Sequence, residues 1–356
     1  MTMDTPLLHI SSSPHIRDSR SVKDIMRDVV FALVPAMIAG FIIFGTRSLL
    51  LIMSSVIGAV VTEYLISEKL LKRKNAICDW SAVITGILVA MNMPVAAPLW
   101  MAALGSAFAI GVAKWTFGGL GNNFINPALA GRAFLMASFP AQMTGAIFAQ
   151  GGLWGKVPAP LCGMDCTVTS ASATAWGGTD ALTSATPLAA LPDLISSGAN
   201  LQDSLLPLFW GNVGGCIGET SAIAILIGAI FLLWRRVIGF TIPVIYVATV
   251  FILALCFSGN EGASPLSSDA FTVAVFHVLS GGLLFGAVFM ATDMVTSPIT
   301  IKGQAIFALG CGILTFVIRK FGGYPEGVSY SILLMNLVTP LIDRYVAPRV
   351  YGTGNK

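Results

Sequence analysis

SAVITGILVAMNMPVAAP, residues 81–98, and GGLLFGAVFMATDMVTSP, residues 281–298, set the architecture, because the second stretch repeats the pattern of the first. Both have a glycine at the sixth position and a proline at the last. Further along, FGG at 117–119 recurs as FGG at 321–323 in nearly the same register. The pattern therefore indicates two related halves. A chance match of glycine and proline within apolar sequence is the alternative.

The composition indicates an integral membrane protein. Of the 356 residues, 55% are hydrophobic and only 10% are charged, whereas soluble domains carry about 25% charged residues. The net charge of +3 is too small to indicate a nucleic-acid partner. The first residues, up to Arg27, carry basic side chains but no apolar core, so they do not form a cleavable signal peptide.

Apolar runs predict about ten transmembrane helices. A helix needs about 20 residues to cross a hydrocarbon core of roughly 30 Å, and fewer where it is broken or shielded by protein. On this criterion the expected spans are 28–46, 48–68, 80–94, 97–116, 123–140, 206–232, 237–257, 275–292, 303–320 and 326–345.

The distribution of charge predicts the orientation of these spans. Basic residues follow spans two, six and ten, at 69–74, 235–236 and 344–349, whereas 141–205 is acidic. By the positive-inside rule both termini are expected on the cytoplasmic side and the long segment on the outer side. Arg319, at an outer helix end, is an exception.

The expected fold is an all-α polytopic membrane protein of two inverted repeats. An N-terminal cytoplasmic or interfacial segment (1–27) precedes a first five-helix repeat (28–140). A periplasmic loop (141–205), a second five-helix repeat (206–345) and a cytoplasmic tail (346–356) follow. Five spans per half is an odd number, so the halves have opposite orientations. Helices interrupted by Gly and Pro in inverted repeats are typical of transporters.

Motifs for metal binding and nucleophilic catalysis are absent from the sequence. There is no P-loop, no G-x-G-x-x-G after a strand and no CxxC, and the three histidines are scattered. We therefore predict no catalytic residue and no metal site. Cys162 and Cys166 form a CxxxC in the expected periplasmic loop, where a small disulfide is the plain interpretation.

Acidic residues within apolar segments are candidates for an ion path. An ionised side chain at the bilayer centre costs about 2.5–3.5 kcal/mol, so such groups usually face a cavity or a partner. Glu63, Glu219 and Asp293 are the candidates for a cation path. Asp79 and Glu326 each open a helix, and for them helix capping is the better interpretation.

The segment GGLGNNFINPALAGRAF, residues 118–134, is rich in glycine and asparagine and enters a span at Pro127. Exposed backbone amides and a helix N-terminus suit an anion or the polar edge of a ring. A structural turn explains the composition equally well.

The stretch TSAT at 183–186, led by Asp180, resembles the Asp-x-x-Ser/Thr-Gly-Ala-Thr signature of flavin attachment. In that signature a transferase esterifies the FMN phosphate to the last threonine. The glycine of the signature is Ser184 here. The chain as a whole resembles the family of Rnf complex D subunits and, less closely, B subunits of the sodium-pumping NADH:quinone oxidoreductase. Further segments that carry the resemblance are SSPH (12–15), GGLGNNFINPA, ATDMVTSP and FGGYPEGV (321–328).

A second Ala-Thr pair tests the assignment of the attachment site. ASAT at 171–174 also ends in Ala-Thr, but Ala171 stands where Ser or Thr is expected and Val168 stands where an acid is expected. Thr174 therefore fails the pattern. In the matching motif Asp180, Thr183 and Ala185 surround the FMN acceptor, Thr186. Pro187 biases the residue before it away from helix, which suits an accessible site.

The resemblance implies a fold like that of urea and ammonium transporters and a role in electron transfer. It implies covalent FMN at Thr186 and a second, non-covalent flavin, riboflavin, among the helices. The implied partners are the other Rnf subunits, a flavin transferase and the lipid bilayer, with no nucleic acid. The assembly couples electron transfer between ferredoxin and NAD to Na⁺ or H⁺ translocation, and we expect no complete activity from this chain alone. A channel or facilitator for a small solute is the alternative, since a repeat with broken helices suits it equally well.

Overall fold

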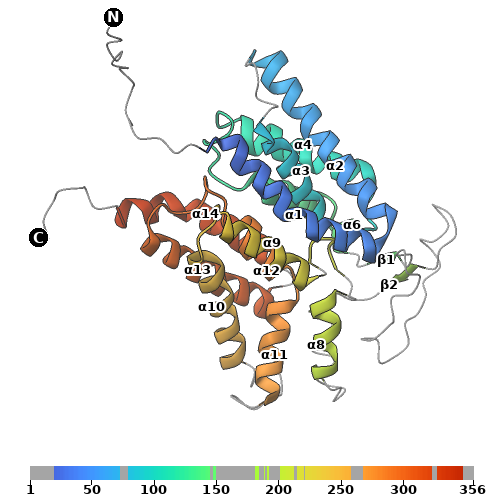
Figure 1. Ribbon diagram of the computed structural model, residues 1–356, viewed down its shortest axis with the longest axis vertical. Helices are drawn as coiled ribbons and strands as arrows, with labels where there is room; N and C mark the ends of the chain where they lie inside the picture. Colours follow the sequence, from blue (N-terminus) through green and yellow to red (C-terminus); the bar gives the residue numbers. More distant parts are fainter. Residues whose placement is uncertain are drawn as a thin grey trace, which may run out of the picture.

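The computed structural model describes residues 20–72, 79–144, 147–149, 181–183, 188, 191, 201–211, 215–219, 221–257, 268–322 and 327–347. Over these residues the protein is helical apart from one two-stranded sheet (Figure 1).

The helices of the first half begin at Val22. They are α1 (Val22–Phe44), α2 (Thr46–Tyr64) with its π-helical extension η1 (Leu65–Leu70), α3 (Ser81–Met91), α4 (Leu99–Phe108) continued by η3 (Ala109–Trp115), α5 (Pro127–Ser138) and α6 (Pro140–Thr144). The strands are β1 (Ile147–Ala149) and β2 (Ala181–Thr183).

The helices of the second half lie mainly in the lower part of Figure 1. They are α8 (Leu201–Trp210), α9 (Ala222–Trp234), α10 (Thr241–Phe257), α11 (Ser268–Leu279), α12 (Leu283–Phe285) continued by η6 (Gly286–Met290), α13 (Ile301–Phe321) and α14 (Val328–Tyr345).

Three helices in the described part of the chain are long and apolar enough to cross a membrane: Val22–Phe44, Thr46–Leu70 and Ile301–Phe321. A fourth candidate is the pair Asp269–Leu279 and Leu283–Met290, which is bent by 57° at its break. Several further apolar helices are shorter, which fits a polytopic membrane protein whose helices are interrupted. The number of ten spans stays a prediction.

The two aligned stretches break at matching positions. α3 ends at Met91 and the chain is not helical again until after Pro98, where α4 begins. In the second stretch η6 ends at Met290, and α13 begins after Thr300. Span boundaries are expected at both places, between 94 and 97 and between 292 and 303, and the chain does leave the helix there. The prediction of one continuous helix over 275–292 is wrong, because α11 ends at Leu279 and α12 begins only at Leu283, after Gly281 and Gly282 with positive φ angles. The inverted relation of the two halves is not tested by these bounds.

The prediction of one helix over 206–232 is wrong. α8 ends at Trp210, and α9 begins only at Ala222 after Ser221, whose side chain accepts a hydrogen bond from Ala224 N. Gly211 has a φ of 100°, a conformation that stops a right-handed helix. The stretch that interrupts the span, GNVGGCIGETS at 211–221, is rich in glycine and carries Asn212, Glu219 and Ser221, but strongly apolar residues flank it on both sides.

Small residues let the helices approach closely. A Cβ atom at Gly86 in α3 would lie 2.7 Å from the Cα of Val56 in α2. A Cβ atom at Gly228 in α9 would overlap the carbonyl oxygen of Ala32 in α1. Such crossings are typical of helix packing in membranes, where apolar surface provides little drive for association.

The two-stranded sheet is the part of the fold that the all-helical expectation misses. β1 and β2 are antiparallel, with Ile147 opposite Thr183. Strands this short leave no measurable alternation in the sequence. The predicted flavin acceptor Thr186 and its motif residues Asp180 and Ala185 lie outside the described residues.

Candidate functional site

The ends of the two interrupted helices meet in the core. Asn92, directly after α3, donates from Nδ2 to Met290 Sδ at 3.6 Å and to Leu88 O at 2.6 Å. Asn126 donates from Nδ2 to Met290 O at 3.2 Å. Two asparagine amides thus satisfy backbone groups that the broken helices leave open.

A turn between α8 and α9 closes the end of α3. Gly218 N donates to Met91 O at 2.7 Å, and Ile217 N donates to Met93 O at 3.2 Å. A side chain at Gly218 would lie 3.0 Å from the carbonyl oxygen of Met91, so this contact needs the bare backbone. The turn also contains Glu219, which therefore lies near the place where the end of α3 meets the end of η6, here called the crossing of the two halves.

Arg132 of α5 lies at this crossing. Its Nη1 donates to Asn92 Oδ1 at 2.9 Å, and its Nη2 lies 3.7 Å from Cys216 Sγ and 3.9 Å from Glu219 Oε1. The side chains of Arg132 and Glu219 are each 7% exposed. A helix C-terminus carries partial negative charge, so a guanidinium beside the end of α3 is well placed.

A second polar cluster, formed by Lys114, Glu63 and Ser81, lies at a cavity of about 120 Å³ that Lys114 and Ser81 help to line. Lys114 Nζ donates to both oxygens of Glu63 at 2.8 Å and to Ser81 Oγ at 2.8 Å. The side chains of Lys114 and Glu63 are 3% and 1% exposed. This is a buried ion pair whose basic partner faces the cavity.

The lining of the cavity combines polar and apolar residues. The polar lining residues are Ser81, Thr85, Lys114, Asn123, Asn126, Thr292 and Asp293. The apolar lining includes Ile84, Leu88, Leu120, Val288 and Phe289.

Asp293 lies in the break between η6 and α13. Its Oδ1 accepts from Val295 N at 3.4 Å, and its Oδ2 accepts from the Thr296 hydroxyl at 3.2 Å. The loop thus holds the carboxylate by its own backbone and side chains at the cavity wall.

The three acids predicted to form an ion path occupy two places. Glu63, through Lys114, and Asp293 belong to the cavity. Glu219 lies at the crossing, where a Cβ at Gly282 would be 2.5 Å from its Oε1. The path itself stays a prediction. In the described part of the chain no group of three or more His, Cys, Asp or Glu side chains could hold a metal ion.

The model of the NQR2, RnfD, RnfE family matches residues 9–352. The chain belongs to this family. The resemblance noted in the sequence is confirmed.

Relatives match over nearly the whole chain. The D subunit of the Na(+)-translocating ferredoxin:NAD(+) oxidoreductase complex of Acetobacterium woodii is 46% identical over 97% of this chain and 95% of its own. The D subunit of the proton-translocating ferredoxin:NAD(+) oxidoreductase complex of Clostridium ljungdahlii is 45% identical over 97% and 96%. The D subunit of the ion-translocating oxidoreductase complex of Stutzerimonas stutzeri is 40% identical over 93% and 92%. The first two relatives are almost equally identical to this chain, but their names give different ions, Na⁺ and the proton.

In this member of the NQR2, RnfD, RnfE family, the 118–134 segment is both a turn and a cavity wall. Gly118, Gly119 and Gly121 have positive φ angles, which explains the glycines. Asn126 Oδ1 accepts from Ala128 N at 3.0 Å, so the N-terminus of α5 is capped by its own chain. The predicted start of that helix at Pro127 is confirmed.

The prediction that Asp79 caps α3 is wrong. The residue at the cap position is Trp80, with a φ of 60°, and it makes no side-chain cap. Asp79 stands one residue too early. Glu326, the other predicted cap, lies outside the described residues, as do Cys162 and Cys166.

Sequence reasoning missed the basic residues of the site. Lys114 and Arg132 lie inside the apolar runs 97–116 and 123–140, where an ionised base is as costly as an acid. The sequence therefore carries a signal for both bases, which a criterion based on acidic residues alone does not include.

Arg319, the exception to the positive-inside rule, has a structural role. It donates to the carbonyl oxygens of His277 at 2.6 Å and of Ser280 and Gly281 at 3.1 Å. These oxygens lie where α11 ends before the α12 break, so the guanidinium satisfies backbone groups that a continuous helix would pair internally.

Proposed function

We propose that this chain is the membrane-embedded, flavin-carrying D subunit of an ion-translocating ferredoxin:NAD oxidoreductase complex. The observation that carries the proposal is the similarity to the subunits of A. woodii and C. ljungdahlii over nearly the full length of all three chains. The chain works with the other subunits of the complex, and ferredoxin and NAD react elsewhere in the assembly.

In this proposal Thr186 carries FMN through a phosphoester bond. Support comes from the DALTSAT motif, residues 180–186, and from the failure of the neighbouring ASAT to match it. A flavin transferase catalyses the attachment with a flavin dinucleotide as donor. Thr186 Oγ forms the new bond to the FMN phosphorus, the phosphoanhydride bond of the donor breaks, a nucleoside monophosphate leaves, and the hydroxyl proton passes to a base. The tether then keeps a redox-active ring at the protein surface.

The proposed place for the second, non-covalent flavin is the cavity beside Lys114. A tricyclic flavin ring has an apolar benzenoid side and a polar, hydrogen-bonding side. The cavity is lined by the polar residues Ser81, Lys114 and Asn123 as well as by leucine, isoleucine and phenylalanine side chains. The lining therefore matches the chemistry of the ring, in the mostly apolar setting with a few polar groups that is usual for cofactor sites. The volume of about 120 Å³ is below the roughly 300–1,000 Å³ of typical ligand pockets, so the wall would have to open to admit the ring. Asn123 would orient its polar edge, while the Lys114 ammonium, whose three donors are bound to Glu63 and Ser81, would place a positive charge beside it.

The architecture proposed for this function is ten spans in two inverted five-helix repeats, like urea and ammonium transporters. The matching breaks after Met91 and Met290 and their meeting through Asn92 support it. Inverted repeats place broken helix ends near the middle of the bilayer. We propose an inner-membrane location with both termini cytoplasmic and the 141–205 segment periplasmic, and a cation path that uses Glu63, Glu219 and Asp293.

The test is in-gel flavin fluorescence of the denatured protein after co-expression with a flavin transferase. The wild type is expected to fluoresce and Thr186→Val to be dark, since valine has no hydroxyl to esterify. Thr174→Val is the matched control and is expected to fluoresce fully. A dark wild type, or a fluorescent Thr186→Val variant, would refute the assignment. A dark wild type would also favour the solute-facilitator alternative, which needs no tethered flavin.

A further inference from the structure

The turn that ends α9 is a tight and unusual one. Val237 N donates to Leu232 O at 2.9 Å, and Arg236 N donates to Leu233 O at 3.0 Å. This pair of bonds defines a Schellman motif, in which the residue at position 236 takes the left-handed conformation. Glycine is the usual residue there, but here Arg236 has a φ of 55°. Strained residues of this kind persist only where surrounding contacts hold them.

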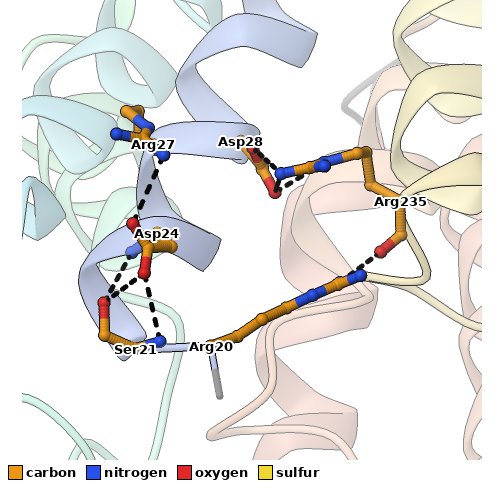
Figure 2. Close-up of polar contacts among 6 residues, drawn as sticks. All are labelled: Arg20, Ser21, Asp24, Arg27, Asp28 and Arg235. Carbon is orange, nitrogen blue, oxygen red and sulfur yellow. Dashed lines mark hydrogen bonds and ion pairs between the residues drawn. The ribbon is translucent and has the colours of Figure 1, made fainter. Parts of the chain in front are cut away.

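The contacts that hold this turn come from the start of α1 (Figure 2). Arg235 Nε donates to Asp28 Oδ2 at 3.0 Å, and Arg235 Nη2 donates to Asp28 Oδ1 at 3.1 Å. Arg20 Nη1 donates to the carbonyl oxygen of Arg235 at 2.6 Å. The turn is thus bound by both its side chain and its backbone. The two-pronged contact fixes its orientation as well as its position.

The two residues of the ion pair are close in sequence to residues that line the cavity. On α1 the lining residues are Ile25, Met26 and Val29, and on the turn they are Leu232, Val237 and Ile238. In the chain Asp28 therefore lies between the lining residues Met26 and Val29. Arg235 lies between the lining residues Leu232 and Val237.

The burial of the pair is uneven, and this matters for its strength. Asp28 is 5% exposed at its side chain and Arg235 is 38% exposed. Removal of Arg235 would leave a buried carboxylate without its bidentate partner, which is far more costly than loss of a surface pair. Further along the same two helices, Gly228 packs directly on the backbone of Ala32. That contact would act as a pivot, so loss of the pair would separate the helix ends rather than the whole helices.

We propose that Asp28 and Arg235, with Arg20, form a latch that holds the wall of the cavity closed and sets how fast a small ligand enters or leaves. The three are positioning residues that act through the lining side chains. The identity of the ligand as non-covalent flavin rests on the proposed function, whereas the closure of the wall does not.

The chain offers a matched control for the latch. Arg27 pairs with Asp24 at 3.3 Å one turn apart on the same end of α1, but these side chains are 50% and 42% exposed and point away from Arg235 (Figure 2). Arg27→Met removes the same charge from the same region without touching the wall. Surface pairs of this kind contribute little.

The first arm of the test measures release of riboflavin from the purified protein after dilution, followed by its fluorescence. Asp28→Asn and Arg235→Met are expected to release it about tenfold faster than the wild type, the rate change that corresponds to about 1.4 kcal/mol less stabilisation of the closed wall, with Arg235→Lys intermediate and Arg27→Met unchanged. Covalent flavin serves as the internal reference and stays constant in all variants. Wild-type release rates in Asp28→Asn and Arg235→Met would overturn the latch.

The second arm does not need a flavin. Met26→Cys, in a background without native cysteines, is labelled with a water-soluble maleimide with and without Asp28→Asn. Faster labelling in the Asp28→Asn background supports the latch, and equal rates overturn it. A wild type that carries no riboflavin overturns the cavity assignment of the proposed function, and the labelling arm then still decides on the latch. If Asp28→Asn does not fold, Arg235→Lys takes its place in both arms.

Discussion

Lys114→Met, which breaks the ion pair beneath the cavity, is expected to destabilise the protein strongly. The variant leaves the Glu63 carboxylate 1% exposed and without the two 2.8 Å hydrogen bonds from Nζ. Because both partners are buried, solvent does not screen the loss. Removal of one partner of a buried pair costs about 3–5 kcal/mol. Glu63→Met alone leaves the Lys114 ammonium buried without its carboxylate partner. It is expected to lower the free energy of unfolding by a similar amount.

The double variant is the informative one. Replacement of a whole buried pair by apolar residues is often neutral, so Glu63→Met with Lys114→Met is expected to recover most of the stability that either single variant loses. The measurement is equilibrium unfolding in mixed micelles of a non-ionic detergent and SDS, followed by tryptophan fluorescence, for all four corners of the cycle. The expectation is wrong if Lys114→Met stays within about 1 kcal/mol of wild type, or if the two single losses simply add.

Three further variants test contacts at the break after α3, between α2 and α3, and among α10, α13 and α14 by the same unfolding measurement. Arg47→Met removes donors at 2.9 and 3.1 Å from two carbonyls in the break after α3 and is expected to cost about 1.5–3 kcal/mol; an unchanged midpoint would contradict this. Gly86→Ala forces a Cβ to within 2.7 Å of Val56 Cα and is expected to cost about 1–3 kcal/mol, whereas Gly239→Ala, with open space, is the neutral control. Tyr246→Phe deletes hydrogen bonds of 2.6 and 3.0 Å to two buried hydroxyls and is expected to cost about 1 kcal/mol; a gain in stability would count against the network.

The sequence predicts those parts of the fold that local chemistry decides. The glycine and proline positions shared by 81–98 and 281–298 indicate interrupted helices in both stretches, and Asn126-Pro127 predicts the start of α5. The interruption after Trp210 is missed because a window of about 19 residues averages the glycine-rich, polar stretch GNVGGCIGETS (211–221) with the strongly apolar residues on either side. Glycines mark that interruption, but glycine is also frequent inside membrane helices.

The candidate site is less predictable, because its contacts join residues far apart in the chain. The sequence shows that Glu63 and Glu219 sit in apolar surroundings, but it does not show that Lys114 and Arg132 are their neighbours. Both bases lie in other helices, so only the packed structure brings them to the acids. The family resemblance predicts membership of the NQR2, RnfD, RnfE family, which is confirmed. It does not predict the ion pair between Asp28 and Arg235.

The role of the tethered flavin is tested by ferredoxin-driven ion uptake in proteoliposomes that hold the complex with Thr186→Val in place of the wild-type chain. We expect the wild-type complex to reduce NAD⁺ and to move Na⁺ or H⁺, and the assembled Thr186→Val complex to lose both activities. Thr186→Ser, which keeps a hydroxyl group, is expected to retain part of them. Undiminished electron transfer and ion uptake in an assembled Thr186→Val complex would contradict the proposed function.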